Sequence, residues 1–596
     1  MGIDNGSILA SESESLSGCR WHLFPHDESY VAAARQRWGI GDIVARVLFA
    51  RSVPLDGIGD FINPKVHTLL PDPLRLKDMD RAVERISRAI ASGEKIGIFG
   101  DYDVDGATSS AVLYRFLRAV GASSVSIHIP DRKTEGYGLG IIGLSSLKSD
   151  GCTLVISVDC GVAGFAEIDW ANQNGLDIVV IDHHEAESGV PNAAAVVDPK
   201  RIDDTSGLYY LAACGVVFLL CVALNRRLRA LGHFSDARPE PDLITLLDLV
   251  ALGTVCDVVP LIGANRAFVS TGLKVMASRA NLGLKALADV ANLVGGPSVY
   301  SLGYVLGPRI NAGGRVGNSE LGAKLLTTTD IVDAQRIASH LDGFNSERKD
   351  IETAVLSEAA AMAEQSLKPG DGFVFVAGEG WHTGVIGIIA GRIKERFNLP
   401  TFVATIDPKG SANGSVRSIL GIDIGACVLG AKEAGILSAG GGHSMAAGFT
   451  LLAAKIPDFR DFIRDYIHRA THGERIIPAL HIDSIIDIGG ITEALIEDLA
   501  TLEPFGTGHD EPRFAVMNAK LTGADAVGSG HIRCYFSSDN GKSITAMSFR
   551  SVGTDLGEAL LGGVGERFRI AGKVKLNVWN SKRQIQMILD DVAKVA

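Results

Sequence analysis

The stretch Gly100-Asp101-Tyr102-Asp103-Val104-Asp105-Gly106 decides the fold of this chain, because it separates a strand-like run from a helix-like one. The residues before it, KIGIFG (95–100), are typical of a buried strand, and residues 107–120 have the apolar spacing of a helix. A capping turn needs one aspartate rather than three, and an EF-hand loop would need a glutamate at its twelfth position, which is missing. Carboxylates crowded beyond the end of a parallel strand repel one another, so this turn predicts a cation site.

The same strand-and-turn pattern recurs along the chain and predicts an α/β fold. SVSIHIP (124–130), CTLVISVD (152–159) and LDIVVID (176–182) are strand-like runs separated by helix-like stretches, which predicts a parallel sheet with helices on both faces. A long helical stretch, about 330–368, leads to a second, smaller α/β unit. Near the end of the sequence, segments 568–579 and 583–592 predict strands of a small OB-type barrel.

Length and composition bound the domain count and the class of protein. A chain of 596 residues exceeds one ordinary core, so we expect several domains. The expected division is a disordered tail (1–20), a parallel-sheet domain with an N-terminal extension (21–325), a connecting helix (326–371), the second α/β domain (372–475) and the OB-like domain (476–596). The formal net charge of −12 excludes a uniformly basic nucleic-acid coat, so local basic grooves or metal ions would have to hold any polyanion.

Cysteine usage and hydropathy indicate the compartment. The 8 cysteines contain no CxxC pair, which argues against zinc ribbons and predicts a reduced, cytoplasmic protein. The apolar stretch 207–224 is at the lower length limit for a membrane span. We interpret it as a buried core helix, because the sequence on both sides is typical of α/β protein.

Two further strand-like runs end in potential metal ligands. Asp159 follows the run at 152–158, and Asp182-His183-His184 follows the next one. A lone aspartate there is more often a helix cap, but adjacent imidazoles at a sheet edge seldom serve packing. Asp257 closes a helix-like segment and is a fourth acidic position. A mostly carboxylate set with one or two imidazoles favours Mn²⁺ or Mg²⁺, and is large enough for two ions that activate water and hold a phosphoryl oxygen.

Basic and glycine-rich segments further along the chain suit phosphate binding. Ser415 and Arg417 lie in GSVRS (414–418), and His443 ends the glycine turn 440–443. Arg309 and Arg315 lie in PRINAGGR (308–315). Guanidinium groups and open backbone N–H groups bind phosphate well, but each segment alone is more often a structural turn or a surface loop.

The C-terminal barrel carries aromatic and basic residues that suit single-stranded nucleic acid. Rings that could stack bases and the cations beside them are Tyr535, Phe536, Trp579, Lys573, Lys575, Lys582 and Arg583. Filling of the barrel core is an equally good interpretation for some of these rings.

Together these motifs resemble the DHH phosphoesterase family. GDYDVDG, Asp-His-His at 182–184 and GTVCDVVPL (253–261) are similar to its first domain. WHTGVIGIIAGR (381–392), the GSVRS segment and GGHSMAAGF (441–449) are similar to its DHHA1 domain. PRINAGGR and LEPFGTG (502–508) extend the resemblance over roughly residues 60–596. Together the motifs are most similar to the branch of the DHH family that degrades single-stranded DNA.

The resemblance implies an activity, cofactors and partners. It implies 5′→3′ exonuclease activity on single-stranded DNA in recombination and repair, with two Mn²⁺ or Mg²⁺ ions. It implies a cytoplasmic monomer without membrane attachment, and single-strand-binding protein and a DNA helicase as further partners.

The family's site residues carry over by motif. The resemblance implies that the metal ligands are Asp103, Asp105, Asp159, His183 and Asp257. It implies that Asp101 and Asp182 are supporting acids and that His184 approaches the scissile phosphate. It implies that the substrate-binding residues are Arg309, Arg315, Ser415, Arg417 and His443.

A few positions depart from the family pattern. Many relatives have His where Phe99 stands, so one potential ligand is missing and the geometry of one metal is in question. Gly314 replaces the usual Ala, and Cys160 and Cys256 flank acids where other small residues are common. None of these changes removes an acid.

Two other functions compete with this one. A related DHH enzyme could act on short oligonucleotides, cyclic dinucleotides or pyrophosphate, although the predicted barrel and the chain length favour a long polymer. A non-catalytic DNA-binding scaffold on the same fold could lose its ligands, whereas here the acids and both histidines are present.

Overall fold

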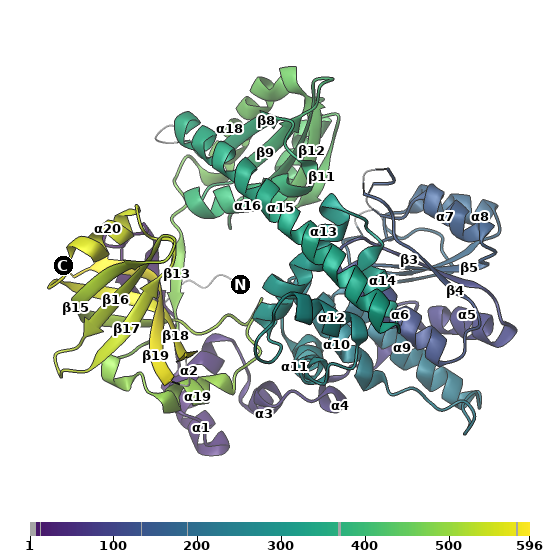
Figure 1. The fold of residues 1–596 in the computed structure, drawn as a ribbon, viewed down its shortest axis with the longest axis horizontal. Coiled ribbons are helices and arrows are strands. Elements are labelled where there is room, and N and C mark those ends of the chain that lie inside the picture. The colour runs from purple at the N-terminus through teal and green to yellow at the C-terminus, as the bar shows by residue number, and fades with distance from the viewer. Residues whose placement is uncertain are drawn as a thin grey trace.

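The structure, a computed structural model, contains three bodies joined by a long helix and a hinge (Figure 1). It describes residues 7–11, 13–132, 134–136, 138–186, 189–367, 371–579 and 582–595. These bodies are a parallel-sheet domain, a second α/β domain and a C-terminal β-barrel, as the sequence predicts.

The first domain is built on an all-parallel sheet with the strand order β4-β3-β5-β6-β7. Its strands are β3 (Ile96–Gly100), β4 (Val125–His128), β5 (Leu154–Val158), β6 (Asp177–Ile181) and β7 (Ala195–Val197). Helices α5 (Met79–Ser92), α6 (Val104–Ala119) and α9 (Ala213–Ala230) pack on one face, and α7 (Ile141–Ser149) and α8 (Phe165–Gln173) pack on the other. Because helices cover both faces, β3 and β5 are buried along their whole length.

Further helices extend this domain beyond its sheet. They are α4 (Val66–Leu69), α10 (Leu247–Cys256), α11 (Gly263–Ala277), α12 (Leu282–Val290), the π-helix η4 (Ser301–Leu306), α13 (Gly307–Val316) and α14 (Leu321–Thr327). The apolar stretch 207–224 mostly forms α9, which packs in the domain core as predicted. Among the described residues, none of the helices has the length and apolar character needed to cross a membrane.

The long helix α15 (Ile331–Ser366) connects the first domain to the second (Figure 1). The second sheet has the order β11-β12-β10-β9-β8, with only β8 and β9 parallel. Its strands are β8 (Val374–Glu379), β9 (Thr401–Ile406), β10 (Ser411–Arg417), β11 (Ala439–His443) and β12 (Ala446–Leu452). Helices α15 and α16 (Thr383–Phe397) cover one face, and α17 (Ile424–Glu433) and α18 (Ile456–Thr471) cover the other.

The C-terminal body is a barrel, because β15 pairs with β18 as well as with β16. Its strands are β14 (Ser484–Ile485), β15 (Phe514–Val527), β16 (His531–Ser537), β17 (Ser543–Ser548), β18 (Arg567–Trp579) and β19 (Lys582–Lys594). Helices α19 (Glu493–Ala500) and α20 (Asp555–Gly562) accompany it. The predicted strands at 568–579 and 583–592 correspond to β18 and β19.

The N-terminal residues pack on this barrel, so the prediction of a disordered tail over 1–20 is wrong for the described residues 7–11 and 13–20. Strand β1 (Ile8–Ala10) pairs with β2 (Arg20–Leu23), which pairs in parallel with β13 (Ala479–Ile482). The buried carboxylate of Asp591 explains why this segment is ordered. It accepts hydrogen bonds from Ser15 Oγ at 2.5 Å and Trp21 Nε1 at 2.7 Å.

The N-terminal extension also joins the barrel rather than the parallel-sheet domain with which the sequence grouped it. Helices α1 (Glu28–Trp38), α2 (Asp42–Ala50) and α3 (Ile58–Ile62) share one hydrophobic core with the barrel strands. The purple helices α1 and α2 lie beside α19 and the yellow barrel in Figure 1. Arg51 stabilises this contact through an ion pair, with its Nη1 2.7 Å from Asp483 Oδ1.

Arg266 of α11 joins the parallel-sheet domain to the hinge before the barrel. Its guanidinium is buried and donates to four backbone carbonyls, those of Phe61, Leu502, Glu503 and Pro504, at 2.6–3.0 Å. It also lies 4.0 Å from the centroid of the Phe61 ring. The LEPFGTG segment is therefore a turn whose backbone carbonyls bind the Arg266 side chain.

Candidate functional site

The aspartate-rich turn after β3 enters α6 through a tight backbone contact. Asp103 caps α6 by accepting from the Gly106 N–H at 3.0 Å. Gly106 is required here, because a Cβ would lie 2.4 Å from the carbonyl oxygen of Asp101. The carboxyl groups of Asp101 and Asp105 are buried, at 1% exposure each. The turn therefore delivers two buried acids and one more exposed acid to the sheet edge.

The N-terminus of α9 fixes the position of Asp105. Its carboxylate accepts from the backbone N–H groups of Ala213 at 2.7 Å and Cys214 at 3.0 Å. These N–H groups have no partner inside the helix, and the positive end of the helix dipole favours an anion there. Only the fold reveals this contact, since the residues are more than 100 positions apart.

The carboxyl ends of β5 and β6 bring Asp159 and the Asp-His-His motif to the same edge. Asp159 is buried and adopts a left-handed conformation, with φ of 61°. Asp182 accepts from the backbone N–H groups of Val162 and His183 and from His184 Nδ1 at 2.7 Å. Asp182 therefore fixes the orientation of the His184 imidazole through the hydrogen bond to its Nδ1.

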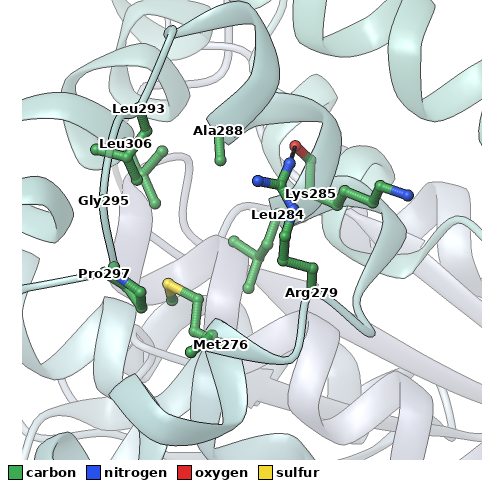
Figure 2. A pocket seen from close by; sticks show the side chains of 11 residues that line it. Met276, Arg279, Leu284, Lys285, Ala288, Leu293, Gly295, Pro297 and Leu306 are labelled. Carbon is green, nitrogen blue, oxygen red and sulfur yellow. Dashed lines mark hydrogen bonds between the residues drawn. The ribbon is translucent and has the colours of Figure 1, made fainter.

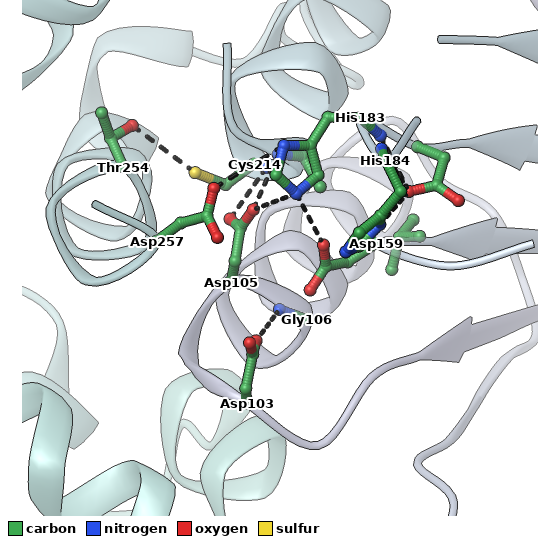
Figure 3. Close-up of polar contacts among 12 residues, drawn as sticks. Asp103, Asp105, Gly106, Asp159, His183, His184, Cys214, Thr254 and Asp257 are labelled. Atoms are coloured by element: carbon green, nitrogen blue, oxygen red, sulfur yellow. Dashed lines mark hydrogen bonds and ion pairs between the residues drawn. The ribbon is translucent and has the colours of Figure 1, made fainter. Parts of the chain in front are cut away.

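His183 lies at the centre of the acidic cluster (Figure 3). Its Nε2 is 3.3 Å from Asp159 Oδ1 and 3.9 Å from Asp105 Oδ2, and its Nδ1 is 3.6 Å from Asp257 Oδ2. Asp257 follows the end of α10 directly. One imidazole thus connects acids from three distant parts of the sequence.

The donor atoms lie close enough to share cations. Three overlapping groups have ligand atoms within 4.8 Å of one another: Asp159–His183–His184, Asp105–His183–Asp257 and Asp101–Asp103–Asp159. Among the described residues, four buried atoms of this cluster have no hydrogen-bond partner, namely Asp101 Oδ1, Asp257 Oδ2 and both ring nitrogens of His183. Buried polar atoms are rarely left without partners. The residues present therefore fit divalent cations.

The pKa values of the cluster residues in the absence of metal also fit a site for divalent cations. Burial and the Asp103 carboxylate raise the pKa of Asp101 to about 8, and burial with Asp105 and Asp103 raises the pKa of Asp257 to about 9. Burial likewise raises the pKa of Asp159 well above its usual range. Burial and the neighbouring His184 lower the pKa of His183 to about 3, so its ring is neutral and can bind a metal. A bound cation would compensate the repulsion that raises the acid pKa values.

His184 has the opposite electrostatics to His183. Burial lowers its pKa, but the hydrogen bond and charge of Asp182 outweigh this and raise the pKa to about 9. The Asp182 pKa falls to about 2, because the bond to His184 and the backbone donors outweigh the cost of burial. The two form an ion pair, and His184 is the more exposed member, at 33% of its side chain. Its ring can therefore donate a proton or a hydrogen bond.

The predicted metal ligands, Asp103, Asp105, Asp159, His183 and Asp257, all lie in this cluster, and their role as ligands stays a prediction. Asp101 and His184 each belong to a group with metal-binding spacing as well, so the geometry does not separate supporting from ligating residues. Phe99 lies elsewhere, buried among apolar side chains, with its ring centroid 5.1 Å from that of His128.

Arginines gather where the second α/β domain meets the first. Arg315 of α13 donates to the Gly384 carbonyl at the start of α16, at 2.9 Å. Burial and the charges of Arg132, Arg348 and Arg417 lower the Arg315 pKa to about 10. Burial also lowers the pKa of Arg417. Cations that repel one another in a buried position suit a bound phosphate.

The second domain supplies Ser415 and Arg417 from one strand. Arg417 Nη1 donates to Ser415 Oγ at 3.0 Å, and both side chains lie against α16. A Cβ on Gly387 would be 3.1 Å from each of them, so this glycine lets the helix approach. Ser415 and Arg417 therefore lie together beside α16, and their role in binding substrate stays a prediction.

Arg309 and His443 are placed differently. Arg309 pairs with Asp342 of α15 at 2.8 Å and donates to the Val305 carbonyl, so its charge is already compensated. His443 is an exposed residue at the end of β11. The motifs in the sequence did not identify Arg132 or Arg348 as site residues. Arg132 follows a predicted strand at the same sheet edge, so the rule that site residues follow the carboxyl ends of parallel strands could have found it.

In the barrel, one of the predicted stacking rings fills the core. Phe536 is fully buried, whereas Tyr535 is 37% exposed. The side chains of Trp579 and Lys582 lie outside the described residues. Lys575 pairs with Glu511 at 3.2 Å and Arg583 with Glu497 at 3.2 Å, which leaves these cations only partly available.

An apolar pocket lies apart from the acidic cluster, between α11, α12 and the loop at 293–297 (Figure 2). Met276, Leu284 and Leu306 line it, with Arg279 and Lys285 at its side. None of the acids or histidines of the cluster lines it.

Comparison with known proteins agrees with this architecture. Residues 95–254 match the N-terminal domain of the DHH family, residues 370–469 match the DHHA1 domain and residues 482–591 match the RecJ OB domain. The fold and the site therefore define the class as DHH proteins that carry a DHHA1 domain.

Individual relatives narrow this class. The chain is 34% identical over 581 residues to the single-stranded-DNA-specific exonuclease RecJ of Bacillus subtilis, covering 97% of this chain and 71% of that protein. It is 36% identical over 461 residues to RecJ of Dickeya dadantii, covering 75% and 80%. The crystal structure of Thermus thermophilus RecJ in complex with Mn²⁺ superposes with a TM-score of 0.81 at 27% identity, covering 97% and 80%. The chain belongs to the RecJ family.

Proposed function

We propose that this protein is an exonuclease that hydrolyses phosphodiester bonds of single-stranded DNA from the 5′ end, in recombination and repair, with two divalent cations, Mn²⁺ or Mg²⁺. The observation that carries the proposal is His183, whose two unpartnered ring nitrogens face carboxylates from three separate chain segments. RecJ relatives named as single-stranded-DNA-specific exonucleases, and RecJ structures with Mn²⁺ and with Mg²⁺, support it.

The proposed metal ligands are Asp103, Asp105, Asp159, His183 and Asp257. Bound cations would supply an activated water and neutralise charge on the leaving oxygen. Asp105 is held in place by the α9 N-terminus, so it is oriented before any cation binds. Asp182 holds His184 protonated, and the one-third exposed ring is proposed to approach the scissile phosphate.

Arg315, Arg417 and Ser415 are proposed to bind the phosphate on the side of the second domain. The Arg315 charge acts on the pKa of Tyr102, which lies between Asp101 and Asp103, so a phosphodiester held by these arginines would lie near the cations. Arg309 and His443 are the weaker candidates, because Arg309 already pairs with Asp342 and His443 is exposed at the end of β11. The proposed cytoplasmic location, monomeric state and partners, single-strand-binding protein and a DNA helicase, rest on the resemblance.

Asp159→Ala tests the proposal directly. Loss of a metal ligand should lower hydrolysis of single-stranded DNA at least about 100-fold, since even outer ligand-supporting groups contribute 10- to 100-fold. Asp169→Ala, which removes an exposed acid from α8, should keep full activity. The measurement is nucleotide release from 5′- and 3′-labelled strands under Mn²⁺ titration. Near-normal release by Asp159→Ala would contradict the proposal.

Substrate length separates the rivals. A polymer-degrading enzyme should act more efficiently as a single strand lengthens enough to reach the barrel. Preference for dinucleotides or cyclic dinucleotides would instead support a DHH enzyme of small substrates. Absence of hydrolysis at every Mn²⁺ and Mg²⁺ concentration would support the non-catalytic scaffold.

A further inference from the structure

Two exposed tyrosines stand on the π-helix η4 in the parallel-sheet domain. Tyr300 precedes the helix and Tyr304 lies within it, and their side chains are 68% and 74% exposed. Their rings stack on each other, with centroids 5.1 Å apart and an angle of 25° between the planes. Large aromatic residues usually bury most of their surface. This pair keeps a flat aromatic face in solvent.

The helix that carries the pair is anchored beside the acidic cluster. Leu302 and Leu306 point into the domain core, which leaves the tyrosines on the outer side. The Cys256 thiol donates to the Leu302 carbonyl at 3.5 Å, and Cys256 immediately precedes Asp257. The tyrosine pair is therefore attached to the same turn that supplies Asp257. Short π-helical turns are frequent at functional sites.

The other side of the pair leads toward the barrel. Val299, next to Tyr300, has its Cγ1 3.7 Å from the place that a Cβ on Gly506 would take. The Leu261 N–H donates to the Thr507 carbonyl at 2.8 Å, in the same hinge. The hinge at 506–508 leads into the barrel strands. The pair thus lies between the acidic cluster and the connection to the barrel.

We infer that Tyr300 and Tyr304 form a nucleobase-stacking site for the single strand as it passes from the barrel to the acidic cluster. Every base offers a flat π-face, so an exposed aromatic pair binds single strands without regard to sequence. Cations and arginines at the cluster bind phosphates, whereas this face binds bases, so the two contacts complement each other. The inference rests on the proposed function, because it assigns the path of the same substrate.

The test compares binding of base-containing and abasic strands. Tyr300→Ala/Tyr304→Ala should bind a thymidine oligonucleotide roughly 5- to 100-fold more weakly than the wild type. It should bind an abasic strand of equal length as well as the wild type does, because that strand has phosphates but no bases. Tyr300→Phe/Tyr304→Phe is the matched control and should keep wild-type affinity for both. Equal loss on both strands, or no loss on either, would overturn the inference.

A second measurement separates this inference from the proposed function and from a folding defect. A strand with 2-aminopurine at successive positions, bound without metal, should lose fluorescence at one or two positions in the wild-type protein and regain it at those positions alone in Tyr300→Ala/Tyr304→Ala. No quenching at any position would overturn the inference even if hydrolysis is intact. Conversely, quenching by a protein that hydrolyses nothing would support the stacking site while the proposed function fails.

Discussion

Replacing Asp182 by asparagine should move the pH dependence of hydrolysis toward acid. Asp182 holds the pKa of His184 at about 9, against an ordinary value of 6.5, through a 2.7 Å hydrogen bond and its charge. The proposed role of His184 needs the protonated ring. Because the raised pKa keeps the ring protonated up to about pH 9, activity that depends on this proton is present below that pH and lost above it.

The size of the shift follows from the geometry. Loss of the carboxylate would remove the main effect that opposes the lowering of the His184 pKa by burial, but the ring is one-third exposed and water weakens the pair. We therefore expect the alkaline limb of the kcat profile to move by about one to two pH units, a roughly 10- to 100-fold change in proton affinity. The asparagine also turns an amide N–H₂ or a weaker acceptor toward the Val162 N–H, which costs about 1–3 kcal/mol of stability.

The assay is kcat for single-stranded DNA from pH 6 to 10 at saturating Mn²⁺, with thermal unfolding of each variant as a check on the fold. Asp169→Asn, at an exposed position of α8, is the control and should leave the profile unchanged. The reasoning fails if Asp182→Asn lowers kcat equally at every pH, since that result would give Asp182 a purely structural role.

Three further predictions concern stability. In metal-free protein the melting temperature should fall as pH rises from 5 to 9, because unfolding releases the protons that Asp101 and Asp257 retain up to pKa values of about 8 and 9. Saturating Mn²⁺ should remove this pH dependence. A melting temperature that does not change with pH in metal-free protein would contradict the prediction. Arg266→Lys keeps the charge but cannot reach four carbonyls, so calorimetry should show about 2–4 kcal/mol less stability at the hinge, and an unchanged transition would argue against the joint. Asp591→Ala leaves the Trp21 indole N–H unpaired, so it should lower the free energy of unfolding by about 1–3 kcal/mol and expose residues 13–23 to protease. Asp590→Ala removes a surface ion pair and should have neither effect.

Local pattern was enough to predict the sheet edge and the side chains that gather there. GDYDVDG and Asp-His-His follow buried strands, and parallel strands place their carboxyl ends at one edge, so Asp103, Asp159 and His183 had to approach one another. The long helix and the two β-rich segments were readable from periodicity for the same reason. Each of these features depends on neighbours in the sequence.

Contacts between distant segments escaped prediction. No local signal shows that the N–H groups of Ala213 and Cys214 bind Asp105, or that Arg266 binds a turn more than 230 residues away. The N-terminal residues read as a polar tail because the partner of Ser15 and Trp21, Asp591, lies at the other end of the sequence. A side chain's donors are visible in the sequence, but the acceptor that satisfies them is not.

The shared core of residues 28–62 and the barrel has a consequence during synthesis. Arg51 must wait for Asp483, 432 residues later, before their contact can form. At roughly 5–20 residues per second, a ribosome needs about 20–90 seconds to cover that distance. Throughout this interval Val47 and Leu48, fully buried in the finished protein, have no partner strands to cover them. Chaperone capture of the nascent chain should therefore concentrate on these first helices, and a circular permutant that places them directly after β19 should depend on it less.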